Sequence, residues 1–160
     1  MKTKILLLED ETDVFTATKQ AFKSIDFTIV DNLLELNGIL LKDPGIQFFD
    51  YVWLDLAIEM PNIPMDIIKQ EIPKMFTDEN GIPNMLSYVA GIYLRGLDYY
   101  KYVVCQNAHL KDYKTTKFVL FSGHKALVEK YKLLEGYEGV PFVKKSGSDS
   151  FDELRKTIKQ

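Results

Sequence analysis

The stretch Lys4-Ile5-Leu6-Leu7-Leu8-Glu9-Asp10 decides the fold, because a short apolar run ends abruptly in two carboxylates. A run that is apolar at every position is typical of a strand buried on both faces of a parallel sheet. Three later stretches repeat this arrangement of an apolar run followed by polar side chains. They are Tyr51-Val52-Trp53-Leu54 before Asp55, Phe118-Val119-Leu120-Phe121 before Ser122, and Val140-Pro141-Phe142-Val143 before Lys144-Lys145.

Helical patterns separate the apolar runs along the whole chain. Alternating strands and helices predict an α/β fold with a doubly wound, five-stranded parallel sheet. Five units of this length fit the flavodoxin-like strand order 2-1-3-4-5. We expect strands at 4–8, 27–30, 51–56, 117–121 and 140–144, and helices at about 12–24, 33–41, 84–107, 125–134 and 150–159.

The polar strand ends should meet at one edge of this sheet. Ligand sites in open parallel sheets lie beyond the carboxyl ends of the strands, and strands 1, 3 and 4 are neighbours in the predicted order. An acidic pair, a lone carboxylate, a hydroxyl and an ammonium then converge. Such a set of side chains can hold a divalent cation and a phosphoryl group.

One segment interrupts the alternation of strands and helices. The connection from Asp55 to Ser122 is about twice as long as a plain strand–helix–strand unit of roughly 30 residues. Four of the six prolines lie in it, at 61, 64, 73 and 83. We therefore predict one domain over residues 1–160, with an insertion at about 57–83 and an extended helix at about 84–107.

Composition limits the kinds of protein that the chain can be. Its 160 residues are 46% hydrophobic and 27% charged, with a net charge of −3, as in a water-soluble globular domain. Lys and Arg are dispersed, which argues against nucleic-acid binding. The apolar stretches are too short for a signal peptide or a membrane span. The single cysteine, Cys105, excludes an internal disulfide, so we expect a cytoplasmic protein.

The chain resembles the response-regulator receiver domains of two-component signalling. Leu8-Glu9-Asp10 is similar to the acidic pair of that family, and Leu54-Asp55 to its phosphoacceptor aspartate. Phe121-Ser122-Gly123 is similar to its hydroxyl residue followed by a small one, and Phe142-Val143-Lys144-Lys145 to its aromatic-x-x-Lys signature. The resemblance covers the chain apart from the insertion.

The resemblance implies a role for each of these residues around a Mg²⁺ cofactor. Asp55 accepts the phosphoryl group and also ligates the metal, together with Asp10, with Glu9 directly or through water, and with the backbone carbonyl of Ala57. The remaining residues act on the phosphoryl group or respond to it. Ser122 and Lys145 bind it, with Lys144 as the competing lysine, Gly123 leaves room for the donor, Ser122 and Phe142 switch, and His124 lies at the rim.

The sequence departs from the family pattern in three places. Pro61 lies six residues after Asp55, where the family usually has a proline four after, and Ser146 replaces a proline after the conserved lysine. Ala57 stands where many receivers carry a polar side chain. These departures bear on the rate of phosphoryl loss and on the loop after Asp55.

The resemblance implies a stand-alone, phosphorylation-gated switch and not an enzyme beyond weak autophosphorylation and autodephosphorylation. A histidine kinase or a histidine phosphotransfer protein donates the phosphoryl group, and a downstream protein binds the face of the fourth helix, fifth strand and fifth helix. One alternative is a pseudo-receiver that docks without phosphorylation. Another is a haloacid-dehalogenase-type phosphohydrolase, although that family needs an aspartate where Ala57 stands.

Tyrosines surround the predicted helix at 84–107, more than one buried stripe requires. Its extension should therefore pack on the inserted segment or on a second copy of the chain, which would make the protein a homodimer. The tyrosines are Tyr93, Tyr99, Tyr100 and Tyr102.

Overall fold

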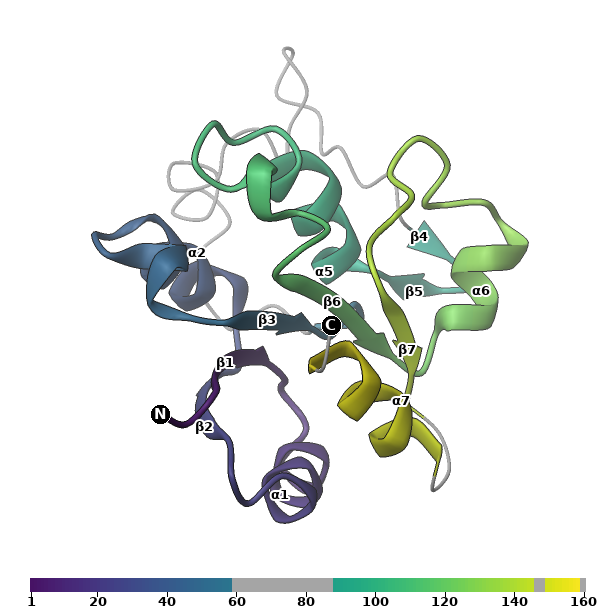
Figure 1. The fold of residues 1–160 in the computed structure, drawn as a ribbon. Coiled ribbons are helices and arrows are strands. Elements are labelled where there is room, and N and C mark those ends of the chain that lie inside the picture. The colour runs from purple at the N-terminus through teal and green to yellow at the C-terminus, as the bar shows by residue number, and fades with distance from the viewer. Residues whose placement is uncertain (59–87, 146–148, 159–160) are drawn as a thin grey trace.

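A five-stranded parallel sheet forms the centre of the protein in the computed structural model, which describes residues 1–58, 88–145 and 149–158 (Figure 1). The strand order is β2-β1-β3-β6-β7, so the predicted α/β class and 2-1-3-4-5 arrangement are confirmed. The strands are β1 (Lys4–Leu8), β2 (Asp26–Val30), β3 (Tyr51–Leu54), β6 (Phe118–Ser122) and β7 (Phe142–Lys144).

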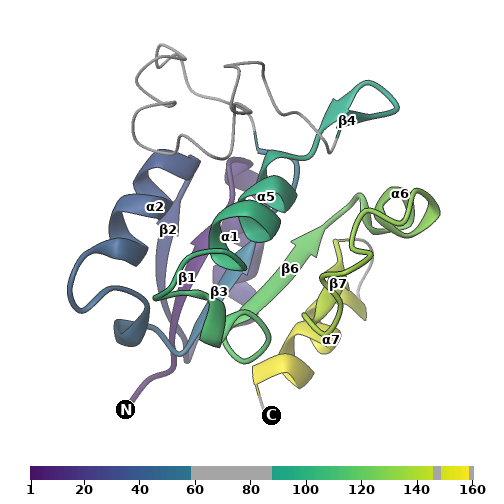
Figure 2. The same cartoon turned by 90° about the horizontal axis from the view of Figure 1, so that it is seen from above.

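Helices cover both faces of the sheet and divide the core into two clusters (Figures 1 and 2). Successive strand residues point to opposite faces, so Leu7 joins one cluster and Leu8 the other. The first face carries α1 (Thr12–Ala21) and α7 (Asp149–Ile158), and the second carries α2 (Leu33–Leu41), α5 (Arg95–Asp98), its π-helical continuation η2 (Tyr99–Val104) and α6 (Lys125–Lys130).

The single tryptophan of the chain lies at the centre of the first face. The Trp53 side chain is fully buried, and its ring centroid lies 5.5 Å from that of Phe22 and 5.7 Å from that of Phe27. Both pairs have edge-to-face geometry. Such pairs contribute roughly 0.5–1.5 kcal/mol each beyond burial, so β3 is anchored firmly in the middle of the sheet.

The prediction of a helix at 84–107 is wrong for the first part of this range. Residues 88–93 form an antiparallel hairpin of β4 (Tyr88–Val89) and β5 (Ile92–Tyr93), and the helix begins only at Arg95. Ala90 and Gly91 both have positive φ, 50° and 78°, which is the pattern of the tight two-residue turn that matches strand twist. This turn outweighs the helical spacing of the apolar residues. The helix ends at Val104, three residues before the predicted end.

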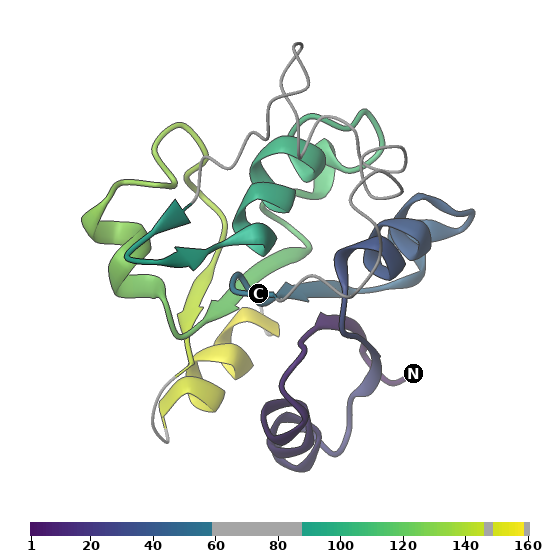
Figure 3. The ribbon, with the colours of Figure 1, turned by 180° about the vertical axis from the view of Figure 1, so that it is seen from behind.

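The hairpin lies at the end of the molecule opposite the two termini (Figure 2). Seen from behind, it runs into α5 on the face of the sheet away from α1 (Figure 3). Two further helices and two strands are shorter than predicted, since α1 ends at Ala21, α6 at Lys130 and β3 at Leu54, and β7 begins only at Phe142. Lys132 has a φ of 52°, which is incompatible with a continuing helix. Two short 3-10 helices are η1 (Gly45–Phe48) and η3 (Lys111–Tyr113).

Several predictions concern residues that the structure does not describe. They are the insertion from 59 to 83 with Pro61, the first four residues of the predicted 84–107 helix, and Ser146. Among the helices in the described parts of the chain, none is both long enough and apolar enough to cross a membrane.

Tyr99 finds its partner within the same domain. Its side chain is fully buried, and its hydroxyl donates to Asn37 Oδ1 of α2 at 2.9 Å. The Tyr102 ring packs edge-on against Tyr137, with centroids 6.4 Å apart. Packing of the helix on the inserted segment lies outside the described residues, and the homodimer stays a prediction.

Candidate functional site

Three charged residues of the site stand one position beyond a strand end, and each keeps one more sheet-like hydrogen bond. The Glu9 N–H donates to the Val30 carbonyl at 2.9 Å, and the Asp55 N–H donates to the Leu8 carbonyl at 3.1 Å. The Lys145 N–H donates to the carbonyl of the last residue of β6 at 3.1 Å. The sheet therefore fixes the backbone from which each of these side chains projects.

The same three residues share one face of the sheet because strand side chains alternate. Glu9 follows Leu7 by two positions, and Asp55 follows Trp53 by two. Leu7 and Trp53 both belong to the cluster under α1 and α7. Lys145 extends β7 in the same way, two positions after a member of that cluster. The predicted convergence of the strand ends is therefore what the fold produces.

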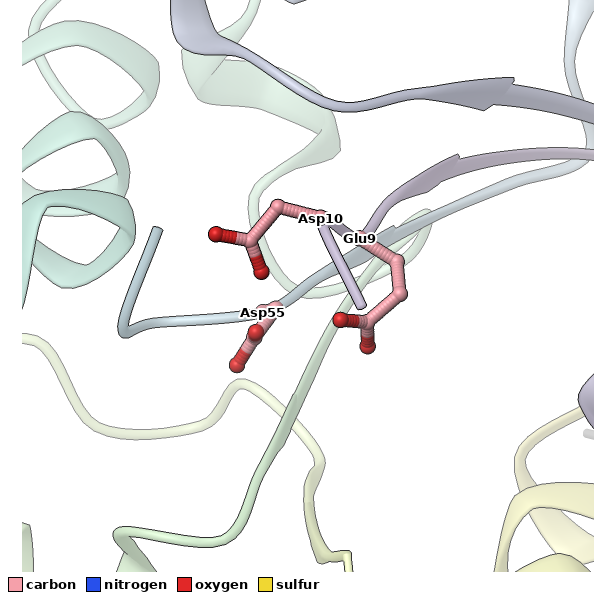
Figure 4. Close-up of side chains that lie close together, drawn as sticks. All are labelled: Glu9, Asp10 and Asp55. Atoms are coloured by element: carbon pink, nitrogen blue, oxygen red, sulfur yellow. The ribbon is translucent and has the colours of Figure 1, made fainter. Parts of the chain in front are cut away.

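Three carboxylates gather at this edge. One oxygen each from Glu9, Asp10 and Asp55 lies within 4.8 Å of the others (Figure 4). Glu9 is fully buried and Asp55 is 3% exposed, whereas Asp10 is half-buried. Two buried carboxylates this close repel each other, so the arrangement needs a nearby positive charge.

Lys145 supplies that charge. Its Nζ forms an ion pair with Glu9 Oε2 and lies 3.1 Å from Asp55 Oδ2. Lys144, the competing lysine in the sequence, is exposed. Burial, and after it the charge of Asp55, raise the pKa of Glu9, while Lys145 opposes both effects, and the net result is a pKa of about 7. A second cation would relieve the same repulsion.

The donor set fits Mg²⁺. This ion prefers carboxylate oxygens, uses one or two of them, and keeps several waters. Three carboxylates from two adjacent strands meet that requirement, and the half-buried Asp10 leaves the cluster open to water. Among the described residues, this is the only group of three or more acidic, histidine or cysteine side chains with metal-ligand spacing.

The hydroxyl residue Ser122 ends β6, one position inside the strand and not directly after it. Ser122 is fully buried, and its Oγ accepts a hydrogen bond from the His124 N–H at 3.2 Å. His124 is half-buried and immediately precedes α6. Gly123 is exposed, and among the described residues a methyl group built there would meet only the Lys145 carbonyl oxygen, at 3.9 Å. The binding roles of Ser122, Gly123 and His124 stay predictions.

Two further predicted residues lie beside the cluster. Phe142 is half-buried against the core, and Lys125 Nζ lies 5.6 Å from its ring centroid while donating to its carbonyl at 2.9 Å. Ala57 is half-buried against the same core. The switching role of Phe142 and the metal contact of the Ala57 carbonyl stay predictions.

Sequence reasoning missed one residue at the site. The Gly96 N–H, at the start of α5, donates to the Leu56 carbonyl at 2.8 Å, directly beside Asp55. A glycine inside an apolar, helix-like stretch is costly and indicates a close backbone approach. That signal was present in Leu94-Arg95-Gly96-Leu97.

Comparisons with known proteins show the fold. The chain matches no protein-family model and no curated protein. It is similar to solved structures, among them a bacteriophytochrome response regulator, with 18% identity, coverage of 99% of this chain and 91% of that chain, and a TM-score of 0.57. The HemR receiver domain from Leptospira biflexa is 16% identical, with coverage of 99% of this chain and 96% of that chain, and a TM-score of 0.57.

A third structure carries a metal. It is the receiver domain of a sensor histidine kinase from Pseudomonas aeruginosa, with a magnesium ion in its active-site cleft, and it gives 13% identity, coverage of 99% and 96%, and a TM-score of 0.51. At such identities the likeness shows the fold alone. The chain has the CheY-like fold of response-regulator receivers over nearly its whole length.

Proposed function

We propose that the protein is a phosphorylation-gated receiver that accepts a phosphoryl group on Asp55 in a Mg²⁺-dependent reaction. The observation that carries the proposal is the placement of Asp55 among Glu9, Asp10 and Lys145, with carboxylate oxygens within 4.8 Å and an ammonium at 3.1 Å. Phosphoryl transfer depends mainly on positioning and on neutralising charge. This arrangement supplies both.

In the proposed step, a carboxylate oxygen of Asp55 forms a bond to phosphorus while the bond from phosphorus to the donor breaks. With acetyl phosphate the leaving acetate keeps the electron pair, and with phosphohistidine the imidazole leaves and is protonated. Bound Mg²⁺ would neutralise phosphoryl charge. Lys145 would hold one phosphoryl oxygen as a point charge, and the Ser122 hydroxyl would donate to another.

The physiological donor in this proposal is a histidine kinase or a histidine phosphotransfer protein. Occupancy of Asp55 would draw the Ser122 hydroxyl toward the phosphoryl group and allow Phe142 to change position. The surface formed by α6, β7 and α7 would then change its preference for a downstream protein. This is a local charge event that biases a two-state element.

Intact-mass measurement after incubation with acetyl phosphate and Mg²⁺ tests the proposal. We expect one added phosphoryl group on the wild-type chain, and none with EDTA or with Asp55→Asn. Asp31→Asn is a matched control, because Asp31 also follows a strand but is exposed and lies outside the three-carboxylate cluster. It should accept the group like wild type.

Two outcomes would contradict the proposal. Phosphorylation that persists in Asp55→Asn would place the acceptor elsewhere. A wild-type chain that binds Mg²⁺ yet takes up no phosphoryl group from acetyl phosphate or from phosphorylated histidine donors would indicate a docking module without phosphorylation.

A further inference from the structure

The backbone of Asp55 is held from two sides. From β1, the Leu8 carbonyl accepts the Asp55 N–H at 3.1 Å. From α5, the Gly96 N–H donates to the Leu56 carbonyl at 2.8 Å. Pairing of β3 with β6 ends at Leu54, two residues before the Leu56 carbonyl that Gly96 holds. The contact with α5 therefore replaces the sheet on the side where the sheet has ended.

The contact at Gly96 tolerates no side chain. A Cβ built there would lie 2.0 Å from the Asp55 carbonyl oxygen, 2.9 Å from Leu56 Cα and 3.0 Å from the Asp55 carbonyl carbon. All three are backbone atoms, which cannot rotate away. Gly96 is the second residue of α5 and has no positive φ, so its backbone conformation suits any residue. The close approach is what requires glycine.

Other residues keep α5 against the same loop. Leu56, Leu94 and Leu97 are fully buried in one cluster. The Tyr99 hydroxyl bonds to Asn37 of α2 in the next turn. The Arg95 guanidinium lies 4.8 Å from the Tyr93 ring centroid, which joins the hairpin to the helix. A displacement of the hairpin or of α5 would therefore reach the Asp55–Leu56 peptide.

We infer that Gly96 is a positioning residue for the reaction at Asp55 and that it links the β4–β5 hairpin to that reaction. The inference rests on the proposed function. By holding the Leu56 carbonyl, Gly96 fixes the plane of the Leu56–Ala57 peptide, next to Asp55. It thereby sets both the direction of the acceptor carboxylate and the direction of the Ala57 carbonyl.

Gly96→Ala tests this role. A carbon–oxygen contact needs about 3.3 Å, so the methyl group would displace α5 or the Asp55 peptide by roughly 1 Å. A misplacement of roughly 1 Å costs about 100-fold in rate. We expect the rate of phosphoryl uptake from acetyl phosphate to fall by about that factor. Loss of orientation in a ligand's support weakens metal binding by about tenfold or more, so the Mg²⁺ dissociation constant should rise accordingly.

Gly38→Ala is the matched control. Gly38 is also a helical glycine, in α2, but a methyl group there meets no atom of the described residues within 4 Å. This variant should keep wild-type uptake and Mg²⁺ affinity. All rates are compared at a temperature where circular dichroism shows each protein to be folded. A folded Gly96→Ala protein within about twofold of wild type in both measurements would overturn the inference.

A measurement on the wild-type chain removes the dependence on a folded variant. Hydrogen exchange of the Gly96 amide, followed by NMR, should be slow and should slow further when Mg²⁺ saturates the site. Exchange that Mg²⁺ leaves unchanged would overturn the inference. A wild-type chain that binds Mg²⁺ but takes no phosphoryl group contradicts the proposed function, and the Mg²⁺ affinity of Gly96→Ala then still tests whether Gly96 positions the metal site. Failure of the wild-type chain to bind Mg²⁺ overturns both.

Discussion

Replacing Lys145 with methionine should distinguish the effects of the two cations that can neutralise the carboxylates, the Lys145 ammonium and Mg²⁺. The ammonium pairs with Glu9 and lies 3.1 Å from Asp55 Oδ2, and the three side chains are 0–12% exposed. At an effective dielectric constant of about 20, one such contact is worth about 5 kcal/mol of Coulomb energy. Removing the lysine also removes the cost of desolvating it, so the net loss is smaller.

The expected loss is about 3 kcal/mol of unfolding free energy in EDTA. Breaking a buried pair costs about 3–5 kcal/mol, and the half-buried Asp10 lets water reach the cluster, which favours the lower end. Mg²⁺ should then stabilise Lys145→Met more than it stabilises wild type, where about 2.7 kcal/mol is expected at 100 times the dissociation constant. The difference in unfolding free energy between the two proteins should narrow as the Mg²⁺ concentration rises.

Urea unfolding with EDTA and across a Mg²⁺ series measures both effects. Lys144→Met is the control, because Lys144 is the exposed neighbour on the same strand. Its stability should stay within about 0.5 kcal/mol of wild type. A loss below about 1 kcal/mol for Lys145→Met in EDTA, or a gap that Mg²⁺ does not change, would refute the charge-balance reasoning.

Three further changes test other parts of the molecule. Ser122→Ala should slow phosphoryl uptake by about tenfold or more, because a hydrogen-bond donor to the transferred group is lost; mass spectrometry should still place the group on Asp55, and an unchanged rate would count against the role of Ser122. Burial raises the pKa of Tyr99, so this residue contributes stability below pH of about 10 that is lost as pH rises. Tyr99→Phe should cost about 1 kcal/mol at pH 8, where Asn37 loses its partner. Above pH of about 10, its free energy of unfolding in urea should fall less steeply than that of wild type, by up to about 1.4 kcal/mol per pH unit, and parallel curves would contradict this. Ala90→Gly should raise the melting temperature by a few degrees, because a φ of 50° strains alanine by about 1 kcal/mol, and a lower melting temperature would show that the turn is unstrained.

The strand ends were readable from the sequence because each is an apolar run with an abrupt polar stop. Burial on both faces demands such runs, and β1 shows it, with Ile5 to Leu8 fully buried. Strand alternation predicts that Lys144 and Lys145 point to opposite sides, and the spacing from Phe142 in the family signature favours Lys145. In the structure only Lys145 reaches Glu9 and Asp55, while Lys144 is exposed.

The hairpin and the contact of α5 with the site could not be predicted from the sequence in the same way. Apolar residues from Val89 to Val104 suit a helix, yet the Ala90-Gly91 turn divides them into a hairpin and a helix. A two-residue turn is a local effect that a longer periodicity conceals. The role of Gly96 depends on a contact with Leu56, 40 positions earlier in the chain. The glycine in its helix-like stretch indicates a close approach, but it does not identify the partner.

The position of Trp53 gives the molecule its own optical probe. This residue is the chain's sole indole, it is fully buried, and it lies on the same side of β3 as Asp55, two positions before it. Changes in the electric field at the acceptor carboxylate are therefore transmitted over a short distance to a fluorophore shielded from solvent quenching. Emission from the unlabelled protein should follow cation binding and acyl-phosphate formation in real time, which allows both to be timed in a stopped-flow instrument.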